Sequence, residues 1–159
     1  MKNEADKLVT FRLGEDLFAA DIFAVERVLR YTAPTAVPDM PDYIEGVIDY
    51  QQRVVPIVNL RLRFELPKVE ARNETRILIL HGGGEWIGVV VDAVTAVTSF
   101  DPAAVAEPPR MFRGLAGEYL KGIVRMGEKL VILLDVEKLL SSTERIALDR
   151  ASGEVLANG

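Results

Sequence analysis

The sequence holds one string that is similar to part of a catalytic site. His81-Gly82-Gly83-Gly84 matches the run that forms an oxyanion hole in some lipases. That chemistry needs a serine nucleophile within a Gly-x-Ser-x-Gly turn, and no serine of the chain lies in one. We therefore interpret the three glycines as a tight hairpin turn. A metal site on His81, the only histidine, would need several carboxylates around it, so we interpret this residue as a surface imidazole.

Two carboxylates each follow an apolar strand. Asp92 comes directly after Val91, and Asp135 comes directly after Leu134. Such a pair can act as general acid and general base, but a carboxylate between a strand and a helix more often caps the helix. We therefore predict two caps. The chain also lacks cysteine and has no phosphate-binding glycine loop between a strand and a helix. The sequence thus predicts no enzyme activity, no metal site and no cofactor.

Composition and charge narrow the class of protein further. The 159 residues suffice for one full core or two small ones, and nearly half of them are apolar. The net charge of −5 argues against binding to nucleic acid, because proteins that bind it usually carry a basic face. The apolar runs are too short to span a bilayer, and the polar N-terminus is unlike a signal peptide. We expect a cytoplasmic protein, and the absence of cysteine fits a reducing compartment.

The segment that organises the chain is 46–61. Two short β-branched runs flank a polar turn at Asp49-Tyr50-Gln51-Gln52, which predicts a hairpin. Pro56 lies in the second run and cannot donate a ladder hydrogen bond, so we expect that strand to be an edge or to bulge there. An apolar hairpin with an unpaired edge suits docking better than catalysis.

Other elements are predicted from alternation and from breakers. The expected strands lie near 8–13, 17–20, 75–80, 86–91, 121–125 and 129–134. The charged segment 61–76, which contains Pro67, is predicted to be a mobile loop, because its arginines are interleaved with glutamates.

Helices are expected at few places. Asp21 is predicted to cap a short helix with an apolar face. This face is formed by Ile22, Val25, and Val28 or Leu29. Asp135 is predicted to cap one turn ending at 139–140. Beyond it, Ser141 and Glu144 form a capping box that predicts a helix in the tail.

The two halves of the chain are similar to each other. Gly46-Val47-Ile48 precedes Asn59 by the same 13 positions that separate Gly122-Ile123-Val124 from Asp135. This spacing favours two copies of one all-β unit, each with about five strands. A single sandwich of one larger pair of sheets is the alternative.

The order of these segments resembles the CheW family of chemotaxis coupling proteins, from about Leu8 to the end of the chain. Seven ordered blocks carry the resemblance: Phe11-Arg12-Leu13-Gly14 with Asp21-Ile22, Val25-Glu26-Arg27-Val28, 41–48, 54–61, 88–94, Tyr119-Leu120-Lys121-Gly122, and 133–140. The resemblance implies an all-β fold with minor helices, in which two five-stranded, SH3-like β-barrels pack together. It implies a single CheW-like domain over 1–159, with a C-terminal helix and tail over 141–159.

By the same resemblance, the protein is a scaffold without catalytic activity. It would couple the cytoplasmic tips of methyl-accepting chemoreceptors to the regulatory domain of the histidine kinase CheA in signalling arrays. It would lie in the cytoplasm, reach the membrane-associated arrays through its partners without inserting into the bilayer, and possess surfaces suited to other CheW-like domains. Contacts of this kind are individually weak and act together by repetition across a lattice.

The resemblance implies two sets of contact residues. The receptor tip would bind in a groove between the barrels, at Ile22, Val25, Val28, Leu29, Val89 and Val91. The kinase-facing edge would carry Arg27, Tyr43, Ile44, Gly46, Asp49, Gln51 and Val54. For each apolar member, packing in the core is the alternative role.

The chain departs from the family pattern at the hairpin turn. The family typically has Asn-x-Arg-Gly where this chain has Asp49-Tyr50-Gln51-Gln52, and typically has an acid where this chain has Arg27. The turn thus lacks its usual glycine, and a positive φ at Gln52 would cost about 1 kcal/mol. The altered charges predict weak coupling to a standard CheA and better coupling to a kinase whose facing residues differ to suit.

Two rival functions are compatible with parts of the sequence. One is a divergent CheW-like scaffold in a specialised, non-flagellar chemosensory pathway. The other, of a different class, is a small hydrolase or ligand-binding barrel, against which the missing nucleophile argues.

Overall fold

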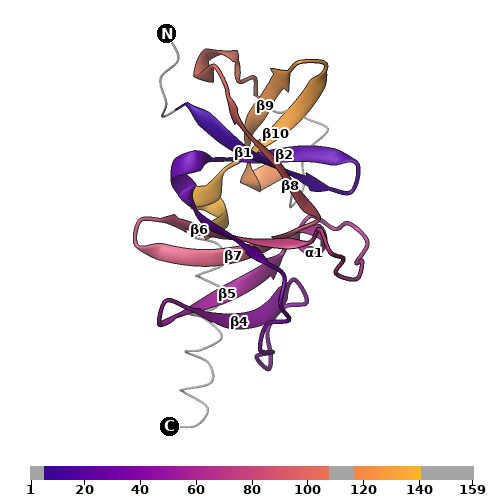
Figure 1. The fold of residues 1–159 in the computed structure, drawn as a ribbon, viewed down its shortest axis with the longest axis vertical. Coiled ribbons are helices and arrows are strands. Elements are labelled where there is room, and N and C mark those ends of the chain that lie inside the picture. Colours follow the sequence, from indigo (N-terminus) through magenta and orange to yellow (C-terminus); the bar gives the residue numbers. More distant parts are fainter. Residues whose placement is uncertain (1–5, 108–116, 141–159) are drawn as a thin grey trace.

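The described residues of the computed structural model, 6–107 and 117–140, form two five-stranded sheets (Figure 1). The first has the order β8-β1-β2-β10-β9, and the second β3-β6-β7-β5-β4. The first sheet consists of β1 (Lys7–Leu13), β2 (Asp16–Asp21), β8 (Ala93–Ser99), β9 (Leu120–Met126) and β10 (Lys129–Leu134). The second consists of β3 (Val25–Arg30), β4 (Ile44–Tyr50), β5 (Arg53–Asn59), β6 (Arg76–Gly82) and β7 (Glu85–Val91). The predicted all-β pair of five-stranded units is confirmed, and we call them the first and second barrel.

Helices in the described part of the chain are short. They are the 3₁₀ turns η1 (Ile22–Ala24), η2 (Pro102–Ala104) and η4 (Gly117–Tyr119), the α-helix α1 (Leu60–Arg63), and a helix over 136–140. The predicted caps at Asp21 and Asp135 are present, and Asn59 forms a further cap that the sequence analysis did not predict. The Asp21 carboxylate accepts from the Phe23 N–H at 2.9 Å, the Asn59 side chain accepts from Leu62 N–H, and Asp135 accepts from Lys138 N–H at 3.1 Å. The capping box at Ser141 and the tail 141–159 lie outside the described residues.

The predicted internal repeat is confirmed and relates β1–β5 to β6–β10. Two of the edge strands, β3 and β8, pair with the first hairpin strand of the other repeat, β6 and β1. In each pairing the register slips by one residue, at Glu26 in β3 and at Thr95 in β8. The repeats therefore exchange one strand each. As a result the second barrel is the continuous run β3–β7, and the first barrel combines β1 and β2 with β8, β9 and β10.

Glycine recurs at one position in each repeat because a loop crosses the edge strand there. Thr35 and Val47 exchange two backbone hydrogen bonds of 2.9 Å, and Ala106 and Ile123 exchange two of 2.8 Å. A Cβ on Gly46 would lie 2.1 Å from the Thr35 carbonyl oxygen, and one on Gly122 would lie 2.7 Å from that of Ala106. The loops also cover part of edge strands β4 and β9, which protects them from unwanted pairing.

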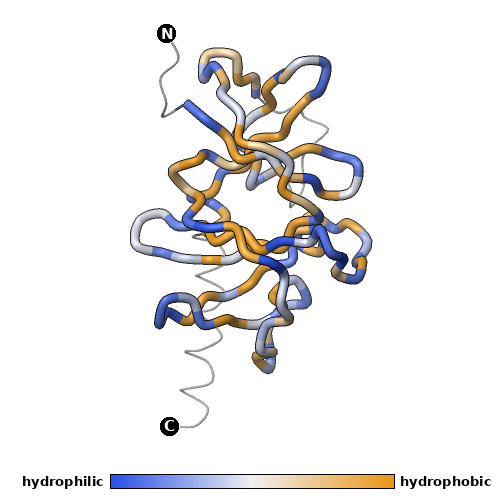
Figure 2. Tube along the Cα trace, in the orientation of Figure 1, coloured by the Kyte–Doolittle hydropathy of each residue, from blue (hydrophilic) through white to orange (hydrophobic). Residues whose placement is uncertain are grey.

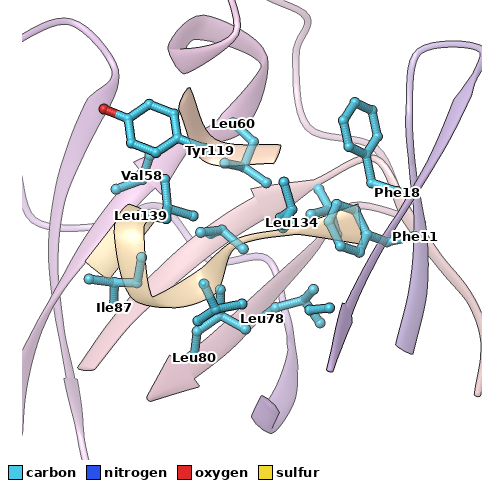
Figure 3. Close-up of a cluster of buried hydrophobic side chains, with 14 of the residues drawn as sticks. Phe11, Phe18, Val58, Leu60, Leu78, Leu80, Ile87, Tyr119, Leu134 and Leu139 are labelled. Carbon is cyan, nitrogen blue, oxygen red and sulfur yellow. The ribbon is translucent and has the colours of Figure 1, made fainter. Parts of the chain in front are cut away.

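The main core lies between the barrels. Figure 3 shows side chains from both sheets meeting there, including Phe11 and Leu134 from the first and Leu78 and Ile87 from the second. Smaller clusters fill each barrel, one around Val131 and one around Ile57. In Figure 2 the hydrophobic segments run along the strands, and hydrophilic residues gather at several of the connecting turns. The fold is thus held by three apolar layers, and the central layer fixes one barrel against the other.

Two local predictions were wrong, and a third holds only in part. The predicted helix from Ile22 is a single 3₁₀ turn followed by β3, because pairing with β6 takes over at Val25. The prediction for Pro56 holds only locally. β5 as a whole is not an edge, since it lies between β4 and β7, but its pairing with β7 begins only at Ile57. The missing N–H of Pro56 therefore interrupts no ladder on that side. The segment 61–76 begins inside α1 rather than in a loop.

Candidate interaction surface

The turn between β4 and β5 has the twist of a type I′ hairpin without a glycine. Gln51 has φ +50° and Gln52 has φ +65°. Positive φ at both central residues matches the right-handed twist of the flanking strands, which is why such turns usually carry asparagine and glycine. The Gln51 Nε2 donates to the Tyr50 hydroxyl at 3.3 Å. The turn therefore adopts this shape although neither of its central residues is glycine.

Beside this turn, two aromatic rings and two arginines form a continuous series of contacts. The rings of Tyr50 and Trp86 have centroids 6.2 Å apart. The Arg27 Cζ lies 6.0 Å from the centre of the Tyr50 ring, and the Arg53 Cζ lies 4.5 Å from that of Trp86. These are cation–π distances. We call Arg27, Tyr50, Trp86 and Arg53 the aromatic–arginine row. It lies at one mouth of the second barrel.

His81 extends this row. Its ring stacks on Trp86 with centroids 5.3 Å apart, and its Nε2 lies 3.8 Å from Oε2 of Glu26. The imidazole is partly exposed, in agreement with the interpretation as a surface residue. The glycines that follow form the turn between β6 and β7, with φ +56° at Gly83 and +84° at Gly84, so that prediction is confirmed.

The predicted kinase-facing residues fall into two places. Four of them lie exposed around the hairpin turn: Arg27, Asp49, Gln51 and Val54. Val54 is 73% exposed. Tyr43, Ile44 and Gly46 lie at the other end of β4. There Tyr43 packs near Arg63, Ile44 is buried, and Gly46 lies under Thr35. The structure thus brings the first four together and separates them from the other three.

The sequence reasoning missed Tyr50, Arg53 and Trp86. Tyr50 and Arg53 are direct partners across the turn, so their side chains share one face of the hairpin. That signal was present in the spacing of the two residues around Gln51 and Gln52. Trp86 comes from the neighbouring hairpin, and only the strand order of the second barrel brings it to the same place.

The predicted receptor-binding residues are also divided. Val89 and Val91 are fully buried in the core between the barrels, so they have no surface to offer a partner in this structure. Leu29 packs against the interior cluster of the second barrel. Val25 is partly buried against the central core, Ile22 lies in η1, and Val28 is 41% exposed. Strand alternation puts Val28 and Leu29 on opposite faces of β3, whereas a helix would have kept both near the face of Val25.

A further exposed valine has the same position in the other repeat. Val28 pairs with Leu78 on β6, a member of the central core. Val97, which is 58% exposed, pairs with Val9 on β1, and Val9 pairs with Ala20 of the same core. Cross-strand partners share a face of the sheet. Both valines therefore emerge on the faces that the two barrels turn toward each other, at the edge strands β3 and β8.

A largely buried ion pair ties the two barrels together. Arg61 on α1 donates to both carboxylate oxygens of Asp92, with distances of 2.8 and 2.6 Å. The Gly14 N–H in the β1–β2 turn donates to Asp92 at 2.7 Å. Burial alone would raise the pKa of Asp92, but the hydrogen bonds from Arg61 and Gly14 and the nearby positive charge hold that pKa below its usual value. Asp92 is thus an inter-barrel tie, and the predicted helix cap at this residue was wrong, because β8 and not a helix follows it.

Glu45 organises a second polar network within the second barrel. It accepts from the Tyr31 hydroxyl at 2.6 Å and from the Asn59 side-chain amide at 2.8 Å. Burial, the hydrogen bond and the charge of Glu45 raise the pKa of Tyr31 to about 12. Since Asn59 also caps α1, this network connects the loop before β4 with the start of that helix.

Arg63 joins the helix α1 to the first barrel. Its guanidinium lies between two tyrosine rings, 4.6 Å from the centre of Tyr43 and 4.5 Å from that of Tyr119, and it donates to the Tyr119 hydroxyl. Cation–π contacts strengthen when the cation is desolvated, as it is here. The Tyr43 end of β4 is therefore built into the contact between the barrels.

The two carboxylates that were considered as an acid–base pair both have structural roles. Asp92 and Asp135 are each engaged in structural hydrogen bonds, and no group of three or more histidine, cysteine or acidic residues within 6–107 and 117–140 is placed to hold a metal ion. Within the same ranges, no helix has the length and apolar character required to cross a bilayer.

Comparison with known proteins assigns a family to this architecture. A model of the CheW-like domain matches residues 7–144. The chain is 34% identical over 146 residues to the chemotaxis protein CheW of Klebsiella aerogenes, covering 92% of this chain and 88% of the relative. It is 32% identical over 148 residues to the chemotaxis protein CheW of Treponema pallidum, covering 91% and 87%. Protein FrzA of Myxococcus xanthus is 33% identical over 144 residues, covering 88% of each chain.

A solved structure agrees with the fold. The scaffolding protein TtCheW from Thermoanaerobacter tengcongensis aligns with a TM-score of 0.76 and 30% identity, over 83% of this chain and 85% of that one. The two-barrel arrangement is therefore shared with a CheW structure.

Proposed function

The chain belongs to the CheW family of chemotaxis coupling proteins, and we propose that it couples the cytoplasmic tips of methyl-accepting chemoreceptors to the regulatory domain of a CheA-type histidine kinase. The observation that carries the proposal is the family match over 7–144. The surfaces of the molecule support it, because its exposed apolar and aromatic residues are suited to protein contacts.

The receptor tip binds along the uncovered edges of the inter-barrel core. Ile22, Val25 and Val28 supply the side from the second barrel. Val97 supplies the matching side from the first barrel, because the repeat places it at the position equivalent to Val28. Two exposed valines at equivalent edges can hold an apolar helical hairpin between them. Leu29, Val89 and Val91 support this surface from beneath.

The kinase domain binds at the hairpin turn of the second barrel. Arg27, Asp49, Gln51 and Val54 are the exposed members of the predicted set. Tyr43, Ile44 and Gly46 act indirectly by holding β4 in place. The protein works as a scaffold in the cytoplasm, without a catalytic activity or a cofactor, and reaches the receptor arrays through these partners.

A second function is favoured by one of the relatives. Protein FrzA, which does not bear the name CheW, matches this chain as well as several CheW proteins do. In this second function, the chain serves a specialised chemosensory pathway with an output other than swimming, and it uses the same two surfaces. Identification of the proteins captured from the native cytoplasm by mass spectrometry distinguishes the two pathways.

The test uses calorimetry with a receptor hairpin tip and with the regulatory domain of the cognate kinase. We expect dissociation constants on the order of micromolar for each. The variant Val28→Lys/Val97→Lys should lose the receptor tip and keep the kinase domain. Val54→Lys, which alters an even more exposed valine on the hairpin, is the control and should keep the receptor tip. An absence of heat with both partners at high micromolar concentration would remove the proposal.

A further inference from the structure

Arg27 and Arg53 are exposed arginines with no internal carboxylate partner in the described part of the chain. The three ion pairs within residues 6–107 and 117–140 all involve other side chains. Each of these two guanidiniums instead lies over an aromatic ring, Arg27 at Tyr50 and Arg53 at Trp86. A cation over a ring keeps its N–H groups at the ring's edge and toward solvent, so its capacity to bind a carboxylate is retained.

The rings also hold the arginines in position. A free arginine loses rotamer entropy when it binds, and that loss offsets most of the gain from an exposed ion pair. Stacking restricts the side chain before the partner arrives, and the planar guanidinium loses less entropy for each hydrogen bond it forms. Tyrosine, tryptophan and arginine, the residue types of this row, are also those that most often dominate the binding energy of protein interfaces.

Strand alternation keeps most nearby carboxylates off this surface. Asp49 pairs with Val54, one position along from the pair of Tyr50 and Arg53, so its side chain lies on the opposite face of the hairpin. Glu85 likewise alternates with Trp86. Glu26, the residue before Arg27, lies 3.8 Å from the His81 Nε2 and is engaged there instead of with either arginine of the row. The mouth of the second barrel is therefore locally cationic in a chain whose net charge is −5.

The equivalent place in the first barrel lacks these features. The registers of the two repeats relate Tyr50 to Met126 and Arg53 to Lys129. They likewise relate Trp86 to Leu17, and Arg27 to Ala96. Neither aromatic ring is repeated, and only one of the two cations is. A pattern found in one barrel and absent from its structural copy is not required by the fold.

We propose that the aromatic–arginine row receives two acidic side chains of the kinase regulatory domain, one at Arg27 and one at Arg53. This inference rests on the proposed function and names the chemistry of the partner surface that docks at the hairpin. The two guanidiniums lie over different rings, so they bind two separate carboxylates. The row thereby selects a partner with a pair of acidic residues and disfavours one that presents cations there.

The experiment measures binding of the regulatory domain of the cognate CheA-type kinase at low and moderate salt. Arg27→Glu/Arg53→Glu should weaken binding by about tenfold or more at low salt, the effect of two partly exposed ion pairs. It should also flatten the dependence of the dissociation constant on salt. Arg27→Lys/Arg53→Lys, which keeps the charges but not the planar donors, should retain part of the affinity.

Two matched controls alter exposed arginines outside the row. Arg30→Glu lies on the same strand as Arg27, and Arg125→Glu lies on the equivalent hairpin of the first barrel. Neither should change kinase affinity by more than about twofold, since unpaired surface charges contribute little. Trp86 is the only tryptophan, so its fluorescence should change when the wild-type protein binds and should respond less in the double glutamate variant.

The outcomes separate the two proposals. If the wild-type protein binds the kinase domain and the double glutamate variant binds equally well, the acidic-partner inference is overturned and the adaptor function stands. If both controls weaken binding as much as the double variant, the effect is one of net charge and the inference is also overturned. If the wild-type protein does not bind at high micromolar concentration, the proposed function itself fails.

Discussion

Gly46→Ala tests whether this position, which the family resemblance places at the kinase-facing edge, is instead required by the fold. Its φ is +145°, and a Cβ there would lie 2.1 Å from the carbonyl oxygen of Thr35. No rotamer relieves this overlap, because the atom it meets belongs to the backbone. The loop at Thr35 must therefore move away from β4.

The expected cost can be built from the contacts that would be lost. Strained backbone at a non-glycine residue costs about 1–3 kcal/mol. Displacing Thr35 breaks its two backbone hydrogen bonds with Val47, each contributing about 1 kcal/mol net. Alanine restricts the unfolded chain and returns about 0.4–1 kcal/mol. We expect a loss of about 2–4.5 kcal/mol in the free energy of unfolding.

Gly83→Ala is the matched control, since Gly83 also has positive φ but nothing lies within 4 Å of its added Cβ. It should cost about 1 kcal/mol, from backbone strain alone. Urea denaturation of both variants, with the free energy extrapolated to water, measures the difference. If Gly46→Ala proved as stable as Gly83→Ala but lost kinase affinity, Gly46 would be a contact residue and the structural reasoning would be refuted.

Three further predictions concern polar groups. Asp92→Asn should destabilise the protein near neutral pH and remove part of its acid sensitivity. Because the pKa of Asp92 is lowered, its carboxylate stabilises the fold above the unfolded pKa, and this contribution is lost as pH falls through the folded pKa. Urea midpoints measured between about pH 2 and 7 test this. Midpoints that change in parallel for both proteins would contradict it. Tyr31→Phe should remove one tyrosine titration near pH 12 from the ultraviolet absorbance. Because this pKa is raised, the hydroxyl stabilises the fold fully below its unfolded pKa of about 10, and this contribution is lost as pH rises through about 12. An unchanged titration curve would show that Tyr31 is not the group with the raised pKa. Asp135→Ala should lower the free energy of unfolding by about 1 kcal/mol and leave partner binding intact, and loss of binding without loss of stability would identify Asp135 as a contact.

The sequence by itself determined the local structure of this protein. Alternation of apolar and polar residues predicted the strands, and the glycines after His81 predicted the hairpin turn in which Gly83 and Gly84 have positive φ. Asp21 and Asp135 were recognisable as caps because a cap bonds to backbone groups two or three residues away. The repeat was visible because Gly46 and Gly122 occupy the same place in each copy. All of these features depend on neighbours along the chain.

Only the tertiary structure decided which surfaces the repeats create. The apolar positions Ile22, Val25 and Val28 fit a helix as well as an edge strand, and pairing with β6 selected the strand. Asp92 accepts from Arg61 and Gly14, which come from different parts of the chain, so no local pattern announces this tie between the barrels. The exchange of β3 and β8 between the repeats likewise depends on contacts across long stretches of sequence. That exchange places Arg27 beside Tyr50, and Val28 and Val97 at equivalent edges, because strand pairing between distant segments is set by the packing of the whole core and not by the residues that adjoin each strand.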